Sequence, residues 1–391
     1  MLAETTDGLE YSGTLEKIRP LVLFGYDDIF GQERAILEVA SAIASRGACP
    51  SFLISQRWGD RVSQELQKRG FLAEVAPYGY FITRFRVPQE LHLPFVNLYG
   101  LIATSARLGS IVRQKKSTHI LAGNFTQCLY GMGYLMRSNI PLIFRVGDAP
   151  PSNPIDGAIW HWCMRRATKI ICNSEYLFRL VSKWARYKGK CQVIYNYASP
   201  RAQSTQPIPV TPGATVVSYI GQLSKMKGVD IFVRAAIRLL KEHPKIYFLI
   251  VGGSNETLTF EQTVREMSQG HDRIVFLGYR DDVDRILNMT DIHVAPSVYE
   301  DPSPNVVVEA KRAGVPSVVF PNGGLPELVR DGIDGYICTK SSVEALIQGI
   351  SWFLDSPERR IDAGRRARED FEDRFGYKRF VDGWARVFSD I

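Results

Sequence analysis

Short apolar runs alternate with helical spacings of apolar residues along most of the chain. In the first half, strands are expected at residues 21–26, 50–55, 119–124, 142–147, 169–174 and 192–197. Between the first two runs, residues 32–46 place Ala35, Ile36, Val39 and Ile43 on one helical face. Continuous apolar strands separated by helices are typical of a parallel sheet that is covered on both faces. The pattern therefore predicts a Rossmann-like, doubly wound α/β domain.

The pattern stops at residues 199–214, which are rich in Pro, Ser and Gln, and then starts again. Strands are expected at 215–221, 246–253, 274–279, 292–297 and 316–321, and helices at 229–241 and 304–313. A length of 391 residues also favours two domains over one. We expect an N-terminal domain at 1–200 and a second Rossmann-like domain at 201–370. The stretch 358–390 is charged and helical, with Phe371, Phe375, Phe380, Trp384 and Val387 as a packing stripe.

Composition narrows the class of protein. No segment approaches the roughly 20 uninterrupted apolar residues that span a bilayer. The acidic, polar residues 1–17 do not form a secretory signal. The six cysteines are scattered without a C-x-x-C pair, which argues against zinc and a disulfide framework and fits a reducing cytoplasm.

Charge is unevenly distributed between the two halves. Residues 1–200 hold 24 Lys and Arg against 15 Asp and Glu, whereas the remainder holds 24 against 26. A basic first half fits either a simple basic face or peripheral contact with an anionic membrane. The aromatic and basic segment 78–100 is either an acceptor-side or membrane-facing surface or an irregular piece of core. Nucleic acid is not an expected partner, because no recognised binding motif accompanies the charge.

The strongest chemical signal is residues 296–314, PSVYEDPSPNVVVEAKRAG. A strand ends, an acidic loop follows, and a helix begins near Pro304 with Ser303 as its expected cap. The helix N-terminus offers free N–H groups and partial positive charge, which suit a diphosphate. Asp301 on the loop can accept hydrogen bonds from sugar hydroxyls, and Glu309 on the helix can accept them from a ribose.

Glycines at other strand ends support the same reading. Gly221 follows a strand, and Lys227-Gly228 precedes a helix, where a lysine can neutralise a phosphate charge. The pairs Gly252-Gly253 and Gly323-Gly324 also lie after expected strands. Each pattern is weak alone, since a tight turn explains it equally well.

Taken in order, these segments resemble the retaining glycosyltransferases of the GT-B fold, specifically glycosyltransferase family 4. The family pattern E-x7-E, E-A-x-A-x-G-x-P, G-G-x-P-E and D-G-x-x-G is similar to the stretches at 301–309, 309–316, 323–327 and 331–335. The resemblance implies two Rossmann-like domains facing across a cleft, with the C-terminal helix at 371–391 returning to the N-terminal domain. It implies metal-independent, retaining transfer of a sugar from a UDP- or GDP-sugar to a saccharide or lipid-linked saccharide, in cell-envelope polysaccharide or glycolipid synthesis.

The resemblance also assigns roles to residues. Asp301 would orient the sugar, Glu309 would hold the ribose, and Lys227 would stabilise the leaving diphosphate. The implied donor-binding set is Gly31, Gly221, Gln222, Lys227, Gly252, Tyr279, Ser303, Pro304, Asn305, Val306 and Glu309. No cofactor or metal is expected, because none of the six histidines has ligand spacing.

The sequence departs from the family pattern at three places. Glu300 lies nine residues before Glu309 and Asp301 eight, so Asp301 is the expected first carboxylate and Glu300 its competitor. The usual strand-end Gly-Arg is Gly221-Gln222, and Lys225, Arg145 or Arg280 are candidates to replace the missing charge. The usual histidine after a later strand is absent, and Asp148 is the nearest polar candidate for catalysis, with a simple turn as its alternative role.

Two other functions stay open from the sequence. A nucleotide-sugar 2-epimerase shares the expected architecture, and a non-catalytic carbohydrate- or nucleotide-binding relative would explain the missing arginine and histidine. A Rossmann dehydrogenase is disfavoured, because no G-x-G-x-x-G follows the first strand.

Overall fold

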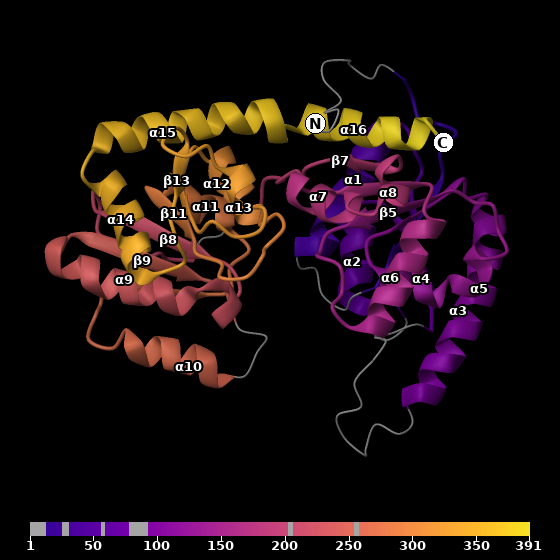
Figure 1. The fold of residues 1–391 in the computed structure, drawn as a ribbon, viewed down its shortest axis with the longest axis horizontal. Helices are drawn as coiled ribbons and strands as arrows, with labels where there is room; N and C mark the ends of the chain where they lie inside the picture. Colours follow the sequence, from indigo (N-terminus) through magenta and orange to yellow (C-terminus); the bar gives the residue numbers. More distant parts are fainter. Residues whose placement is uncertain (1–12, 26–30, 56–58, 78–92, 202–205, 254–257) are drawn as a thin grey trace. The chain divides into compact units, whose positions relative to one another are not determined.

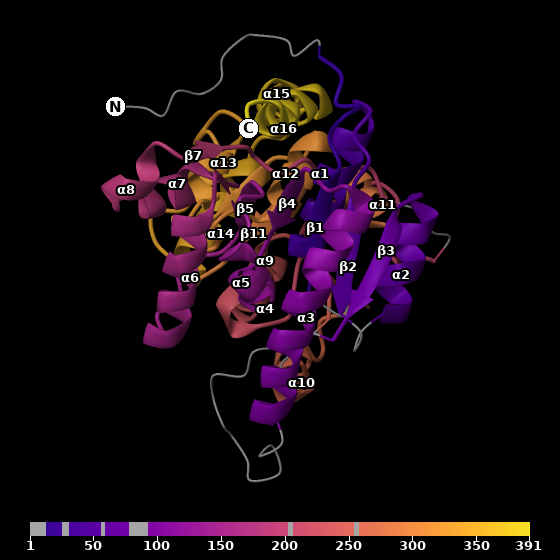
Figure 2. The same ribbon diagram turned by 90° about the vertical axis from the view of Figure 1, so that its right-hand side faces the viewer.

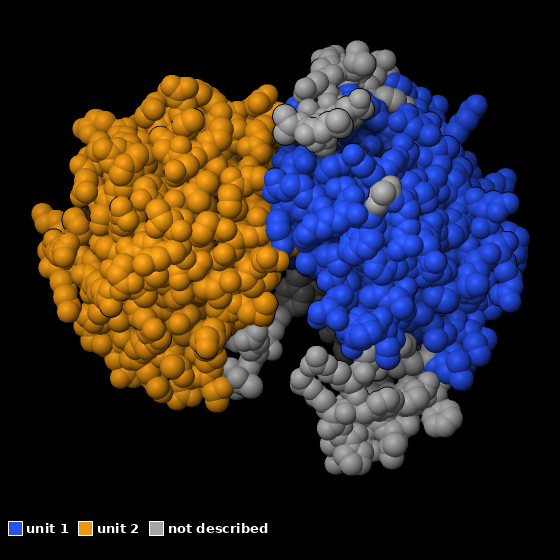
Figure 3. All heavy atoms as spheres, viewed as in Figure 1, with its two compact units in different colours: residues 1–196, 377–391 blue, residues 197–376 orange. Residues whose placement is uncertain are grey.

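A computed structural model describes residues 13–25, 31–55, 59–77, 93–201, 206–253 and 258–391. The chain forms two compact units, which are coloured separately in Figure 3. Unit 1 comprises residues 1–196 and 377–391, and unit 2 comprises residues 197–376. The expected boundaries were after residues 200 and 370. Most of the aromatic and basic segment 78–100 lies outside the described residues.

Unit 1 is built on a parallel sheet, as the apolar runs predict (Figure 1). Within the described residues its strand order is β3-β2-β1-β4-β5-β6-β7, so the sheet grows outward in both directions from the central pair β1 and β4. The strands are β1 (Pro20–Phe24), β2 (Ser51–Ser55), β3 (Leu72–Ala76), β4 (His119–Ala122), β5 (Leu142–Val146), β6 (Lys169–Cys172) and β7 (Cys191–Val193).

The central strands of unit 1 are buried along their whole length, which is why their runs are continuously apolar. The edge strand β3 was not expected, because its sequence LAEVA is half exposed and carries a glutamate. The helices of unit 1 are α1 (Gly31–Ala44), α2 (Gly59–Lys68), α3 (Leu93–Lys115), α4 (Phe125–Tyr130), α5 (Met132–Leu135), α6 (Pro154–Arg166), α7 (Glu175–Ser182), α8 (Ala185–Lys188) and α16 (Tyr377–Ser389).

Unit 2 repeats the same topology. The strand order in its described residues is β10-β9-β8-β11-β12-β13, and all pairs are parallel. This is the order of a dinucleotide-binding Rossmann sheet. Its strands are β8 (Thr215–Ile220), β9 (Ile246–Val251), β10 (Ile274–Gly278), β11 (Ile292–Ala295), β12 (Ser317–Val319) and β13 (Gly335–Ile337). β13 was not expected, because its sequence GYI holds a single aliphatic side chain and begins with the last glycine of the D-G-x-x-G stretch.

The helices of unit 2 cover both faces of this sheet (Figure 1). They are the 3-10 turn η2 (Lys225–Lys227), α9 (Val229–Glu242), α10 (Leu258–Met267), α11 (Val283–Asn288), α12 (Asn305–Arg312), α13 (Leu325–Leu328), α14 (Val343–Leu354), α15 (Pro357–Asp370) and the π-helical turn η3 (Phe371–Phe375). A two-domain α/β fold, predicted from the sequence, is therefore confirmed.

The helical stretch at the end of the chain is divided between the units. α15 and η3 belong to unit 2, the helix stops at Gly376, and α16 belongs to unit 1. There α16 packs against α1, and its Phe388 ring lies 5.4 Å from the ring of His119. The five residues of the expected stripe are all buried, but Phe371 and Phe375 pack in unit 2 and the others in unit 1.

A buried lysine fixes α12 within unit 2. The Lys311 side chain is 1% exposed, and its ammonium lies 2.9 Å from Asp334 and 2.8 Å from Asp370. Arg330 also reaches both carboxylates, at 2.6 and 3.4 Å. A buried charge is tolerated only when it is paired in this way. The cluster therefore ties α12 to the turn before β13 and to the end of α15.

No helix within the described residues is long and apolar enough to cross a bilayer. All six cysteines are free thiols.

Replacing Lys311 with methionine should lower the free energy of unfolding of unit 2 by about 3–5 kcal/mol, because Asp334 and Asp370 would lose a buried counter-ion. Chemical denaturation followed by circular dichroism measures this loss. The matched control is Arg238→Met, which breaks the exposed Arg238–Glu344 pair and should cost less than about 1 kcal/mol. Similar losses in both variants would contradict this account of the cluster.

Candidate active site

The candidate site in unit 2 lies where its sheet reverses direction. β8 and β11 are neighbours, but the chain goes from β8 outward to β9 and β10 before it returns to β11. The loops after β8 and β11 therefore diverge at their carboxyl ends, which is where open α/β sheets bind ligands. Residues 221–228 form the first loop and residues 296–304 the second. These loops carry Gly221, Gln222 and Lys227, and Asp301 and Ser303.

The two loops are held together through their backbones. The Val298 N–H donates to the Met226 carbonyl at 2.9 Å. Gly228 has φ +71°, and a Cβ at this position would overlap the carbonyl oxygen of Pro296. The glycine is therefore required for contact between loops.

Gly252 has a similar packing role at the end of β9. Its φ is +140°, and a Cβ there would overlap the carbonyl oxygen of Gly221. The Gly252 N–H donates a hydrogen bond to the Gly278 carbonyl at 2.8 Å. Gly252, expected to contact the donor, is thus tied to the neighbouring strand ends.

An ion pair joins the two loops at the side-chain level. The Lys227 ammonium contacts the Asp301 carboxylate and lies 5.1 Å from the centre of the Tyr299 ring. Asp301 is only 5% exposed. Burial lowers the pKa of Lys227, but the charge of Asp301 and the neighbouring Tyr299 outweigh burial and raise the pKa above its ordinary value. Lys227 therefore carries a positive charge at neutral pH, next to the start of α12.

The structure distinguishes between the two candidate first carboxylates by position. Glu300 is exposed, whereas Asp301 is buried and paired with Lys227. The Gly324 N–H donates to the Asp301 carbonyl at 2.8 Å, and a Cβ on Gly323 would overlap the backbone of Glu300 and Asp301. The glycines of the G-G-x-P-E stretch therefore bring a second loop against the Asp301 backbone.

The start of α12 differs in detail from the expected cap. The helix begins at Asn305 with Pro304 in the cap position, and Ser303 makes no capping hydrogen bond. Instead the Ser303 hydroxyl is buried and has no partner within the described residues. A helix start also leaves N–H groups of its first turn without partners inside the helix, and Val306 lies in that turn of α12. Hydrogen-bonding capacity is thus concentrated beside Lys227.

Glu309 has a partner that the sequence did not indicate. Its carboxylate is 4% exposed and pairs with the guanidinium of Arg201. The Arg201 backbone N–H donates to Asp284 at 2.9 Å, and Asp284 also pairs with Arg312 on α12. Arg201 lies in the stretch expected to be a linker, where no pattern marks it as a site residue. It holds Glu309 in one orientation one turn inside the helix.

The side chains that are candidates to replace the missing strand-end arginine lie in different environments. Arg280 is buried and forms a bidentate pair with Asp282, with both contacts at 2.7 Å. Hydrogen bonds from Arg280 hold the pKa of Asp282 below its usual range, so this guanidinium is committed to a structural contact. Lys225 and Gln222 are exposed on the loop after β8, and Tyr279 is 61% exposed after β10.

Unit 1 has its own polar pocket at the carboxyl ends of β4 and β5. It is a small cavity of about 40 Å³, lined by Gln32, Asn124, Arg145, Asp148 and Trp160 among others. Asp148 is exposed and accepts a hydrogen bond from Gln32 at 2.7 Å, and Gly31 is the first residue of α1 beside it. Gln32 had no assigned role in the sequence.

Arg145 is the unusual member of this pocket. It is 2% exposed, and its Nη2 donates to Asn196 at 2.7 Å. Its Nη1 has no hydrogen-bond partner in the described part of the chain. Burial lowers the pKa of Arg145 to about 10, although the charges of Asp148 and Glu33 oppose this shift. A buried guanidinium with one such N–H group left over can donate a hydrogen bond to an anionic or hydroxyl ligand.

Among the described residues, no group of three or more His, Cys, Asp or Glu side chains is arranged to hold a metal ion.

Comparisons with known proteins match this architecture. A model described as "Glycosyltransferase Family 4" matches residues 29–200, and one described as "Glycosyl transferases group 1" matches residues 201–370. The chain also resembles the solved structure of Anabaena HepE in complex with UDP-glucose, with a TM-score of 0.76 and 18% identity over 96% of this chain and 100% of that one. At this identity the likeness establishes the fold.

Curated relatives are similar over shorter stretches. Spore coat protein SA of Bacillus subtilis is 29% identical over 185 residues, or 45% of this chain and 49% of its own length. N-acetyl-alpha-D-glucosaminyl L-malate synthase of Bacillus anthracis is 27% identical over 207 residues, or 51% and 54%. The chain thus spans about half the length of the curated relatives it matches.

The two doubly wound units and these matches define a protein of the GT-B class. Within that class, the chain belongs to the family 4 glycosyltransferases. The resemblance seen in the sequence is confirmed.

Gly252→Ala should destabilise unit 2 several-fold more than Gly270→Ala. Both glycines have positive φ, but a Cβ at Gly270 meets nothing within 4 Å, so that variant carries only the strain of the left-handed backbone, about 1–2 kcal/mol. Chemical denaturation of the two variants gives the comparison. Equal destabilisation would show that the contact with Gly221 is unimportant.

Proposed function

We propose that this protein is a retaining, metal-independent glycosyltransferase that uses a nucleotide-diphosphate sugar. The observation that carries the proposal is the Lys227–Asp301 pair, whose carboxylate is buried and whose ammonium is partly exposed, together with the Ser303 hydroxyl just before α12, which is buried and has no partner within the described residues. One cation, one free hydroxyl and a helix N-terminus together suit a diphosphate. The buried carboxylate of Asp301 lies within the same group and suits a neutral, hydroxyl-rich sugar.

Each residue has a role in the proposed reaction. The bond between the anomeric carbon and the diphosphate oxygen breaks, and charge develops on the leaving diphosphate. Lys227 and the N–H groups at the start of α12 stabilise that charge because they are already in place. Asp301 orients the sugar, and Glu309, held by Arg201, accepts hydrogen bonds from the ribose.

The acceptor hydroxyl attacks the anomeric carbon from the face that the diphosphate leaves, so the configuration is retained. Its proton passes to an oxygen of the leaving diphosphate, so no separate protein base is required. The pocket of unit 1 with Asp148 and Arg145 is the proposed acceptor side. The acceptor is a saccharide or lipid-linked saccharide of cell-envelope polysaccharide or glycolipid synthesis, and free cysteines fit a cytoplasmic enzyme.

Donor binding should depend on the two buried carboxylates. UDP, UDP-glucose and GDP-mannose are the probes, and a ligand bound by the native state raises the melting temperature. Asp301→Asn and Glu309→Gln should weaken binding of the stabilising sugar nucleotide by roughly 10–100-fold, the range for a charge-assisted hydrogen bond in a buried site. The control Glu300→Gln removes a neighbouring exposed carboxylate and should change affinity less than about 2-fold. Equal effects at Glu300 and Asp301 would contradict the assignment of the first carboxylate.

Transfer itself is tested with the stabilising sugar nucleotide and a panel of saccharide and lipid-linked acceptors. We expect a product whose anomeric configuration, read from its proton NMR coupling, matches the donor, and a rate that excess EDTA leaves unchanged. Inversion or a requirement for metal would overturn the proposed mechanism. An epimerised sugar nucleotide formed without any acceptor would instead identify an epimerase.

A further inference from the structure

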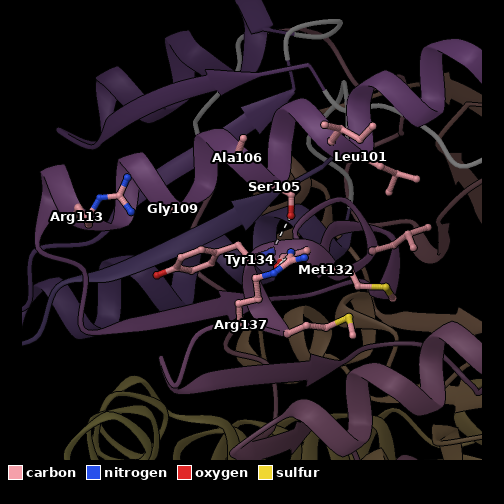
Figure 4. Close-up of a pocket in the computed structure, with 12 residues that line it drawn as sticks. Leu101, Ser105, Ala106, Gly109, Arg113, Met132, Tyr134 and Arg137 are labelled. Carbon is pink, nitrogen blue, oxygen red and sulfur yellow. Dashed lines mark hydrogen bonds between the residues drawn. The ribbon is translucent and has the colours of Figure 1, made fainter.

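A large groove in unit 1 lies outside the proposed site. It is about 650 Å³ in volume and runs between α3 and α5, which pack against each other (Figures 2 and 4). Sites that bind small molecules span about 300–1,000 Å³, so the groove is large enough for a ligand. Apolar side chains form most of its wall, including Leu101, Ile102, Leu129, Met132 and Met136.

The rim of this groove exposes large apolar side chains. Leu98, Tyr99 and Ile102 on α3 are 56%, 63% and 64% exposed, and Met136 just after α5 is 66% exposed. Leu98 and Tyr99 lie four and three residues before Ile102, so the three side chains share one face of α3. A contiguous exposed apolar patch marks a surface that contacts a partner or a membrane.

The amino-acid sequence that forms α3, α5 and the segments between them lacks acidic residues. Residues 91–147 contain no Asp or Glu. Arg113 and Arg137 line the groove, and Arg107 and Lys116 are exposed on or next to α3. Lys115 is partly neutralised by Glu74 of β3, at 2.8 Å. In Figure 4, Arg113 lies at the opposite end of the groove from Leu101. The surface therefore combines an apolar channel with positive charge, and among these basic residues only Lys115 has an acidic partner within the described part of the chain.

We propose that the α3–α5 groove binds an anionic lipid of a bilayer surface. The lipid chain occupies the apolar channel, and the positive charges of Arg113 and Arg137 along the groove attract its anionic headgroup. Leu98, Tyr99 and Ile102 enter the boundary between headgroups and acyl chains, where amphipathic surfaces with basic flanks bind. This role goes beyond the proposed transfer reaction and uses none of its residues.

The groove suits a lipid better than a sugar. Recognition of a saccharide needs directional hydrogen bonds, and the groove wall holds no carboxylate or amide side chain. The Ser105 hydroxyl already accepts a hydrogen bond from the Tyr134 N–H at 2.8 Å. Charge complementarity also favours an anionic membrane over a second copy of this chain, whose matching surface would carry the same charge.

The charged part of the proposal is tested by co-sedimentation with phosphatidylcholine vesicles, with and without phosphatidylglycerol. The protein should sediment only with the anionic vesicles. Arg113→Gln/Arg137→Gln should lower the partition coefficient roughly 30-fold, since each basic residue near an anionic surface contributes about 1 kcal/mol. The control Lys183→Gln/Lys188→Gln removes two exposed charges from the same unit, away from the groove, and should lower it less than about 3-fold.

The role of the apolar side chains is tested with the double variant Ile102→Ser/Met136→Ser. The double variant Ile361→Ser/Met289→Ser is the control. The control replaces the same residue types at exposed positions of unit 2. The groove variant should lose vesicle binding while its melting temperature and its response to sugar nucleotides stay at wild-type values. Because the readout is membrane binding, it is independent of whether transfer occurs.

Three results would overturn the proposal. The first is equal vesicle binding by the groove and control variants. The second is binding to neutral and anionic vesicles alike. The third is a concentration-dependent dimer that the Ile102→Ser/Met136→Ser variant abolishes, because the groove would then be an interface between copies.

Discussion

The burial of one charge, the ammonium of Lys311, constrains the whole of unit 2. Lys311 is the last residue but one of α12, and its two carboxylate partners come from the turn before β13 and from α15. Since an unpaired charge at this depth is strongly unfavourable, the three elements can pack only in the arrangement that brings these groups together. Asp334 belongs to the D-G-x-x-G stretch, so this stretch contacts the C-terminal end of α12. Asp331 reinforces this role, since its carboxylate accepts a hydrogen bond from the Ile337 N–H at 2.8 Å.

With its C-terminal end fixed, α12 presents its N-terminus to loops that are themselves in backbone contact. Gly228 lies against Pro296, Gly252 against Gly221, and Gly323 against Asp301. Each contact would be lost with any side chain larger than hydrogen, so each glycine fixes one distance in the site. Such a site needs little rearrangement when charge develops on a ligand, which is the condition for electrostatic catalysis.

Much of the fold could be predicted because buried parallel strands leave a continuous apolar run, as in β1 and β9. β3 and β13 could not, since one is half exposed and the other, GYI, begins with the last glycine of the D-G-x-x-G stretch. Their spacing around a helix start singled out Asp301 and Glu309, and the structure buries both side chains there. Arg201 was not, because its role depends on tertiary contact with Glu309 over 108 positions of sequence. Ser303 shows the same limit, since its position in the sequence suits a cap but its hydroxyl has no partner within the described residues.

The division of the last two helices between the units affects how the chain folds during synthesis. α16 supplies Phe380, Trp384 and Phe388 to the interior of unit 1, yet residues 377–389 leave the ribosome only after all of unit 2. The apolar face of α1 therefore stays uncovered in nascent unit 1 while residues 197–376, which form unit 2, are translated. Exposed apolar surface of this kind promotes aggregation, so we expect nascent unit 1 to bind chaperones.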